Sequence, residues 1–221
     1  MTSMRKNTGN LLAVAVLLAF AGRALALSTI DYRPAGATVD FSFYDDETTI
    51  TSPVSLSYTG GVATFSISGD SFKKLTQEST WYGCFAEGDA VLWTAGNAGP
   101  LTIEFSSGIT AFATQIQSEQ YGEGTAWISA YDAFDTLLGT FSVPSTASGY
   151  NDNSAALIGV AVDDGDNLIS RIELDIAGFD GVDFAINRIS LTPGTIPAPA
   201  AILLVGVGCG LVGWLRRRGL V

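Results

Sequence analysis

The chain contains no histidine, so any chemistry it performs has to come from other side chains. Without histidine, Ser-His-Asp and Cys-His nucleophiles are excluded, and the commonest zinc and copper ligand is missing. A hydrolase of this composition would depend on carboxylates alone, as glycosidases do. With 22 acidic residues, close carboxylate pairs arise by chance, and Glu104 and Glu173 each alternate with apolar neighbours. We interpret both as solvent-facing strand residues and expect no catalytic residue and no enzymatic activity.

The densest group of oxygen ligands is the segment 163–167, which reads Asp-Asp-Gly-Asp-Asn. Calcium is held by oxygen ligands, and an acidic loop with a glycine can supply several of them. The spacing differs from that of an EF-hand, and the same residue types favour a turn between strands. We favour a turn and expect no metal and no cofactor, with a structural calcium ion as the alternative. Segments 45–47 and 180–183 are weaker examples of the same pattern.

Trp81 and Tyr82 form an aromatic pair between the polar segment 76–80 and Gly83. Aromatic rings stack on the apolar faces of sugars, so an exposed pair here could contact a glycan. The other interpretation, which we favour, is that both rings pack within the core or against a loop. Trp93 and Trp127 lie in more apolar surroundings, and we interpret them as core residues.

Alternation of apolar and polar residues with a period of two runs through the segment that holds these side chains. The clearest pair is 54–58 and 62–67, joined by Thr59-Gly60-Gly61, which predicts a hairpin. Residues 71–77 could form one helical turn, and 122–124 a turn. Together the pattern predicts an all-β, antiparallel β-sandwich. The other predicted strands are 39–43, 101–105, 109–116, 126–131, 138–143, 157–162, 169–176 and 184–191.

Residues 1–26 have the order of a secretory signal peptide. Arg5 and Lys6 form the basic start, and 11–21 form an apolar segment. Ala24 and Ala26 give the small residues of a signal cleavage site, so we expect the mature chain to start at Leu27. The sequence therefore predicts export through the inner membrane and a folded ectodomain at 27–193.

The ectodomain is far more acidic than the whole chain, whose net charge is −11. All 22 acidic residues fall within 27–193 but only five of the 11 basic residues do, which leaves a charge of −17. Such a charge repels nucleic acid and anionic lipid, so we expect no nucleic-acid partner. Cys84 is the only cysteine of the ectodomain, and beside Phe85 we expect a buried thiol.

The segment 194–221 has three parts in a fixed order: prolines, an uncharged apolar stretch at 200–215, and a basic cluster at 216–218. A helix over 200–215 would span about 24 Å, somewhat less than the ~30 Å hydrocarbon core, so it predicts a marginal transmembrane segment. Arginines after such a segment remain on the cytoplasmic side. The basic residues are Arg216, Arg217 and Arg218.

This tail resembles the PEP-CTERM family of bacterial sorting signals, in particular its variants with Val-Pro-Leu-Pro-Ala. The resemblance implies an exosortase as processing partner, cleavage near the prolines, transient anchoring, and delivery to the cell surface or extracellular matrix. Ala198 stands where these signals usually have Glu or Leu, and Cys209 is unusual within the helix. A plain single-span anchor is the alternative. The residues expected at the processing site are Pro197, Ala198, Pro199 and Ala200.

The region 109–191 looks like the jelly-roll half of many PEP-CTERM proteins and of related carbohydrate-binding modules. Members often end with Phe-x-Ile-Asp, where the Asp of some modules holds a structural calcium ion. Here the matching residues are Phe184, Ile186 and Asn187, so an uncharged amide takes the place of that carboxylate.

These observations predict an exported, non-enzymatic surface or matrix protein that is associated with exopolysaccharide. The first alternative is a carbohydrate-binding module of the cell surface, with Trp81 and Tyr82 in contact with the sugar. The second alternative is a glycosidase or lyase that uses carboxylates.

Overall fold

The computed structural model describes residues 27–150, 152–163, 168–178 and 183–194. The predicted signal peptide at 1–26 and the predicted tail from 195 onward lie outside the described residues, and so do most of segments 163–167 and 180–183. The strands are β1 Leu27–Thr29, β2 Ala37–Val39, β3 Thr49–Thr51, β4 Val54–Tyr58, β5 Gly61–Ser66, β6 Ser71–Thr76, β7 Ala90–Trp93, β8 Leu101–Ser118, β9 Gly122–Tyr131, β10 Leu137–Ala147, β11 Ala156–Val162, β12 Ile169–Ala177, β13 Phe184–Ile186 and β14 Ile189–Pro193.

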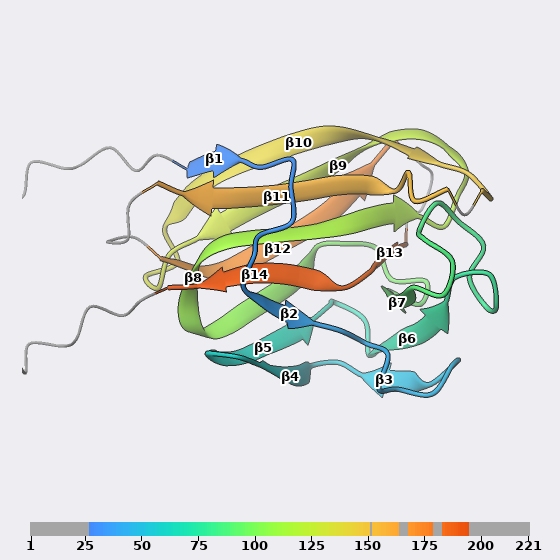
Figure 1. The fold of residues 1–221 in the computed structure, drawn as a ribbon, viewed down its shortest axis with the longest axis horizontal. Coiled ribbons are helices and arrows are strands. Elements are labelled where there is room, and N and C mark those ends of the chain that lie inside the picture. The colour runs from blue at the N-terminus through green and yellow to red at the C-terminus, as the bar shows by residue number, and fades with distance from the viewer. Residues whose placement is uncertain (1–26, 151, 164–167, 179–182, 195–221) are drawn as a thin grey trace, which may run out of the picture.

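The strands are paired antiparallel throughout and form two layers that face each other (Figure 1). One layer contains β10, β9, β12, the first half of β8, β5 and β4. The other contains β1, β11, the second half of β8, β14 and β2, with β13, β7, β6 and β3 beside them. The all-β antiparallel sandwich predicted from the alternation is therefore confirmed. No helix long and apolar enough to cross a membrane occurs in the described part of the chain.

Strand β8 connects the two layers because it passes from one to the other within a single strand (Figure 1). Its first half alternates between buried and exposed residues, as expected for a strand with one face toward the core. Its second half is buried on both sides, and its polar members there form hydrogen bonds. The core between the layers contains mainly aromatic and β-branched side chains, with Phe41 and Phe65 in edge-to-face contact at 5.6 Å.

The hairpin predicted around Thr59-Gly60-Gly61 is present. Tyr58 pairs with Gly61, so the connection is the two-residue loop Thr59-Gly60. Gly60 has a φ of 115°, a value that glycine adopts without steric cost. The predicted strands at 126–131, 138–143, 157–162 and 169–176 also lie within observed strands.

Several predicted boundaries are wrong. Residues 101–105 and 109–116 belong to one strand, because Ser106, Ser107 and Gly108 continue the extended backbone. Residues 71–77, predicted as a helical turn, contain strand β6, since Phe72 and Lys74 alternate inward against β3 and β7.

The turn predicted at 122–124 is instead the start of β9, which pairs with the end of β10. The strand predicted at 184–191 is interrupted at Asn187 and Arg188, where the chain leaves β13 and enters β14. The strand predicted at 39–43 ends at Val39, and Phe43 is exposed. Local alternation does not distinguish these cases, because the neighbouring strands decide where pairing stops.

Candidate functional site

Of the aromatic pair Trp81 and Tyr82, one ring is exposed and the other is buried. Tyr82 is 59% exposed, as a contact residue would be, whereas Trp81 is 5% exposed and packs against Phe85 and Trp93. The packed position that we favoured for both rings is therefore confirmed for Trp81 and wrong for Tyr82. Its indole forms part of a small apolar cluster beneath the loop rather than a platform on the surface.

A tight turn after β6 places these two residues. The carbonyl oxygen of Thr76 accepts hydrogen bonds from the backbone N–H groups of Thr80 (2.9 Å) and Trp81 (3.0 Å). Glu78 has a φ of 65° within this turn, and its N–H donates to the carbonyl oxygen of Trp81 (2.9 Å). The backbone thus folds back on itself, so that Trp81 points inward and Tyr82 outward.

Gly83 follows the pair, and its missing side chain allows close packing. A Cβ atom at this position would lie 2.5 Å from Trp81 Nε1 and 2.4 Å from Gln117 Oε1. Cys84 comes next, with 1% of its surface exposed, which confirms the expected buried thiol. Its N–H donates to Gln117 Oε1 (2.5 Å), which fixes the loop to the second half of β8.

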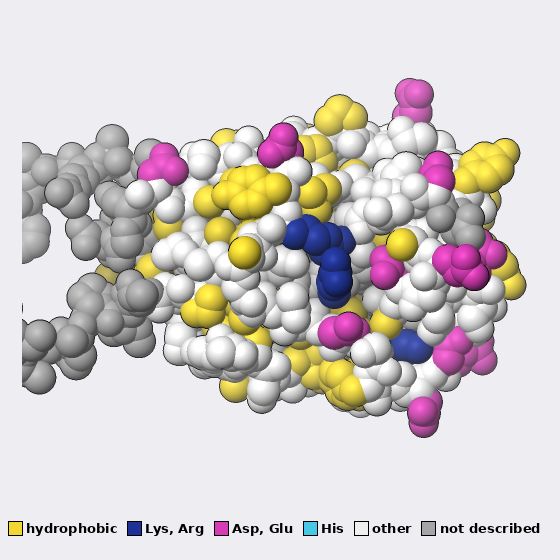
Figure 2. Space-filling model, in the orientation of Figure 1, with side chains coloured by type: hydrophobic (Ala, Val, Ile, Leu, Met, Phe, Trp, Pro, Cys, Tyr) yellow, Lys and Arg dark blue, Asp and Glu magenta, His cyan; other side chains and the backbone are white. Residues whose placement is uncertain are grey.

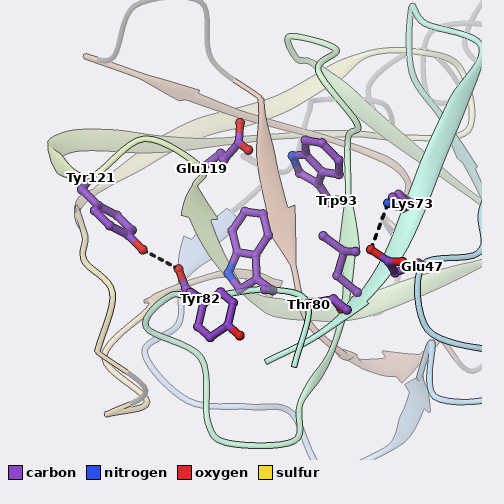
Figure 3. A pocket seen from close by; sticks show the side chains of 9 residues that line it. Glu47, Lys73, Thr80, Tyr82, Trp93, Glu119 and Tyr121 are labelled. Atoms are coloured by element: carbon purple, nitrogen blue, oxygen red, sulfur yellow. Dashed lines mark hydrogen bonds and ion pairs between the residues drawn. The ribbon is translucent and has the colours of Figure 1, made fainter. Parts of the chain in front are cut away.

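The loop forms one wall of a pocket of about 370 Å³ (Figure 3). This size falls in the range of small-molecule sites, which is roughly 300–1,000 Å³. The pocket draws its side chains from five places in the chain: the segment before β3, strand β6, the loop after β6, strand β7 and the segment between β8 and β9. The lining residues are Glu47, Lys73, Leu75, Thr80, Trp81, Tyr82, Trp93, Glu119 and Tyr121.

Four aromatic rings line this pocket, which we call the aromatic cleft. Tyr82 and Tyr121 are both exposed, and the hydroxyl of Tyr121 donates to the backbone oxygen of Tyr82 (2.9 Å; Figure 3). The centroids of the Trp81 and Trp93 rings are 6.4 Å apart. Both indole N–H groups are buried and have no acceptor among the described residues. In Figure 3 the indole nitrogen of Trp93 points toward the side of the cleft that carries Glu119.

Charged groups stand at two sides of the aromatic cleft. Lys73 Nζ lies 3.5 Å from Glu47 Oε1, so this pair provides both a donor and an acceptor (Figure 3). On the other side, burial raises the pKa of Glu119, and the nearby carboxyl of Asp183 raises it further. Aromatic faces with a few polar groups at the edge can accommodate a ligand that has apolar faces and hydroxyl groups.

Of the nine lining residues, only Trp81 and Tyr82 were candidate glycan contacts from the sequence. Trp93 was expected in the core, and it is half-buried at the cleft instead. Tyr121 and Glu119 lie nearly forty residues from Tyr82 along the chain, and no local pattern connects them. Only the pairing of β8 with β13, and of β13 with β7, brings these segments together.

Carboxylates in the described parts of segments 45–47 and 180–183 form hydrogen bonds with protein groups. Asp46 of segment 45–47 accepts hydrogen bonds from Thr76 Oγ1 and Thr80 Oγ1, both at 2.9 Å, so it fixes the loop. Asp183 Oδ2 accepts from the N–H of Gly96 (2.8 Å). Asn187 is buried and donates to Asp89 Oδ2 (3.0 Å). No cluster of three metal-binding side chains is found within the described ranges, which leave out residues 164–167 and 179–182.

Glu104 is exposed and Glu173 half-exposed on strand faces whose apolar neighbours are buried, which confirms the alternation. Trp127 was expected in the core, and it is 41% exposed instead. Its ring lies on the outer face of β9, beside Ser129 and Asp175, in a shallow hollow of about 360 Å³. The ring points outward because Ala126 and Ile128 take the two inward positions around it.

Comparisons with known proteins give fold-level likeness only. No protein-family model matches the chain, and no curated protein matches it. Among solved structures, the chain is similar to CsCBM6-3 from Clostridium stercorarium in complex with cellobiose, with a TM-score of 0.32 and 11% identity over 71% of this chain and 92% of that one.

Two further structures belong to larger enzymes. One is a glycoside hydrolase family 43 arabinoxylan arabinofuranohydrolase from Bacillus subtilis, in complex with cellotetraose, with a TM-score of 0.32, 20% identity and coverage of 56% of this chain and 25% of that one. The other is the CBM22-1–GH10 part of xylanase 10B from Clostridium thermocellum with xylohexaose, with a TM-score of 0.26, 14% identity and coverage of 77% and 30%. The chain thus spans less than a third of either enzyme chain, and TM-scores this low carry no conclusion about its site.

Proposed function

We propose that the domain at 27–193 is a carbohydrate-binding module of the cell surface and that the aromatic cleft holds the sugar. The observation that carries the proposal is the convergence of four aromatic side chains with Glu47, Lys73 and Glu119 around one pocket. The exposed rings of Tyr82 and Tyr121 offer apolar faces to a sugar ring, and the charged groups offer partners for its hydroxyls.

The unpaired indole N–H groups support the same ligand class. A buried donor without an acceptor costs free energy, about 1–3 kcal/mol for each group. Trp81 and Trp93 both carry such a donor at the wall of the aromatic cleft. A sugar is rich in hydroxyl oxygens that can serve as acceptors, so we expect a bound sugar to offer a partner to the N–H of the half-buried Trp93, whereas the N–H of Trp81 lies beside Gly83 beneath the loop.

We also propose that the module is non-enzymatic and is exported, sorted by an exosortase and retained at the cell surface or in the matrix. The support is the order of elements in the sequence, namely the signal peptide at 1–26 and the tail at 194–221 with its prolines and Arg216–Arg218. Retention outside the cell fits an ectodomain charge of −17, which disfavours anionic lipid and nucleic acid as partners.

Binding to a panel of neutral, soluble polysaccharides, followed by calorimetry on the best ligand, tests the proposal. Tyr82→Ala removes an exposed ring, so we expect an intact fold and about a tenfold loss of affinity, because ring stacking contributes about 0.5–1.5 kcal/mol beyond the buried area. Trp81→Ala is less suitable, since it would open a cavity in the apolar cluster. Tyr150→Ala is the matched control, because Tyr150 is 74% exposed and does not line the cleft.

Two results would contradict the proposal. Binding that is equal in the wild type and in Tyr82→Ala would place the sugar elsewhere, with the hollow beside Trp127 as the next surface to test. Release of reducing sugar that disappears in Glu119→Gln would show a glycosidase, since a carboxyl with a raised pKa in a sugar site can act as a general acid.

A further inference from the structure

A second pocket, of about 360 Å³, lies away from the aromatic cleft and shares no lining residue with it. Its polar lining comes from the segment between β1 and β2, the residues before β7, strand β8, the segment before β11 and the connection from β13 to β14. Figure 2 shows one continuous patch of basic side chains in the middle of this face, and elsewhere only a small isolated one. The polar lining residues are Arg33, Asp89, Gln115, Asn153, Asn187 and Arg188.

Neutral groups hold the Arg33 guanidinium in place. Its Nη2 donates to Gln115 Oε1 (2.6 Å) and Asn187 Oδ1 (3.1 Å), and its Nη1 donates to the backbone oxygen of Arg188 (3.0 Å). A guanidinium has five N–H donors, so these three bonds leave further donors available. All three acceptors are uncharged, and the Asp89 carboxylate in the same pocket acts on Arg33 without forming an ion pair with it, so the guanidinium is oriented but only partly compensated.

The amides that hold Arg33 are themselves fixed. Asn187 Nδ2 donates to Gln115 Oε1 (2.7 Å) and to Asp89 Oδ2 (3.0 Å). Gln115 Nε2 donates to Asn153 Oδ1 (3.0 Å) and to the backbone oxygen of Ala155 (3.2 Å). Asn187 and Gln115 are 1% and 7% exposed, so the support of the guanidinium is rigid and buried.

The charge balance of this pocket is unusual for the molecule. Lys73, Lys74 and Arg171 each form an ion pair with a carboxylate, at 3.5, 3.4 and 2.8 Å respectively. Within the described ranges, Arg33 and Arg188 are the two basic residues without such a partner, and they line the same pocket. Burial lowers the pKa of Arg33, and the charge of Arg188 lowers it further, while Asp89 acts in the opposite sense.

We propose that the pocket of Arg33 and Arg188 binds one oxyanion, a carboxylate or a sulfate ester, carried by an acidic sugar. Arg33 is half-buried and fixed, while the exposed Arg188 can swing to enclose the group. Guanidinium groups match the geometry of such oxyanions with two parallel hydrogen bonds. That the oxyanion belongs to a sugar rests on the proposed function, whereas the oxyanion site itself stands on these contacts alone.

The overall charge of the domain selects among acidic sugars. A densely charged polyanion places many charges near the surrounding carboxylates and is repelled by them. A single acidic group gains the short-range contacts, and it is repelled only by carboxylates within about one Debye length, ~8–10 Å. We therefore expect isolated acidic residues in an otherwise neutral chain to bind better than polyuronates.

The first experiment titrates free glucuronate into the full chain and observes the part at 27–193. The NMR signals of the arginine Nε–H groups are followed during the titration, and those of Arg33 and Arg188 are expected to shift while that of Arg171 does not. This measurement has no contribution from the aromatic cleft, so it can succeed even where neutral glycans fail to bind. Absence of any shift at Arg33 and Arg188 at millimolar glucuronate would overturn the oxyanion site.

The second experiment compares a glucuronate–glucose disaccharide, its glucose 6-sulfate counterpart and the neutral glucose disaccharide. The wild type is expected to bind one anionic disaccharide about tenfold more tightly than the neutral one, because one charge-assisted hydrogen bond contributes roughly that much affinity. The tighter of the two anionic forms identifies the source of the oxyanion. Equal affinity for all three disaccharides would overturn the proposal.

Matched variants complete the test. Arg188→Gln removes a charge from an exposed side chain, and Arg33→Lys keeps the charge but not the two parallel donors; each is expected to reduce the preference to less than about threefold. Arg171→Gln removes the same charge elsewhere and is expected to leave the preference unchanged. A preference that survives in both Arg188→Gln and Arg33→Lys would contradict the assignment even if one of these variants were destabilised.

Discussion

At the scale of single residues, Glu119 and Asp183 bring two carboxyl groups together at the edge of the aromatic cleft. Asp183 is 5% exposed and is fixed by the N–H of Gly96, so it cannot move away from Glu119. Burial and this neighbour raise the pKa of Glu119 above its usual value of 4.5. The folded protein therefore binds a proton at Glu119 more tightly than the unfolded chain does.

This proton affinity has a consequence for stability. Between pH 4.5 and the raised pKa, the folded state holds more protons than the unfolded state, so stability falls as the pH rises through this window. Glu119→Gln removes the titrating group. We therefore expect the Tm of this variant minus the Tm of the wild type to increase as the pH rises from about 4.5. Differential scanning fluorimetry across pH 4–8 measures this, with Glu123→Gln at the start of β9 as control. A difference in Tm that does not change with pH would contradict the prediction.

At the scale of elements, the aromatic cleft depends on how the loop after β6 is fixed. Asp46 accepts hydrogen bonds from Thr76, Ser79 and Thr80 at 2.9, 3.2 and 2.9 Å, so one carboxylate determines the path of the turn. Its other partner is Lys74, which is 6% exposed and would otherwise be a buried charge without a counter-ion. The element that carries Tyr82 is thereby connected to the segment before β3.

We expect Asp46→Asn to destabilise the domain by about 1–3 kcal/mol, because charge-assisted hydrogen bonds are lost and Lys74 is left unpaired. Urea denaturation at pH 7 measures the change, and Asp45→Asn is the matched control on the neighbouring exposed residue. An equal loss in both variants would show a general charge effect instead.

The same carboxylate should make the stability of the domain depend on pH in acid. Burial alone would raise the pKa of Asp46, but the hydrogen bonds from Thr80 and Thr76 and the charge of Lys74 lower it overall, below its usual 3.8. The stabilisation is therefore present above pH 3.8 and is lost as the pH falls through the lowered pKa. The stability gap between wild type and Asp46→Asn is expected to narrow in this acidic window.

At the scale of the whole molecule, β8 joins the two layers and the connections between layers assemble both sites. Gln115 and Gln117 lie two residues apart in the second half of β8 and point to different surroundings. Gln115 supports the Arg33 pocket, and Gln117 holds the loop beneath the aromatic cleft. One central strand therefore fixes the two pockets relative to each other.

Delivery of the whole chain can be tested by intact mass spectrometry of the protein from its native cells, in membrane and extracellular fractions. We expect a species that starts near Leu27 and ends between Pro197 and Ala200, because the tail resembles an exosortase substrate. A variant with Pro197→Ala and Pro199→Ala is the control and should keep its tail. Wild-type protein that retains Arg216–Arg218 in cells with an exosortase would show an ordinary membrane anchor.

The sequence by itself was sufficient for the fold class and the clearest local features. Alternation predicted the sandwich, Thr59-Gly60-Gly61 predicted the first hairpin, and Cys84 was correctly expected to be buried. These features are determined by short-range physics, since side chains alternate across a strand and glycine tolerates a positive φ. Absence of histidine excluded whole classes of catalytic site in the same way.

The tertiary structure decided where strands end and which distant residues share a pocket. Tyr82 and Trp127 are exposed although both were expected to be packed, because exposure depends on what covers a ring and not on its neighbours in sequence. Glu119 and Tyr121 reach the aromatic cleft only through pairing across β7, β13 and β8. Arg33 and Asn187 meet although 154 residues separate them. Such contacts are the product of long-range packing, which no local pattern in the sequence encodes.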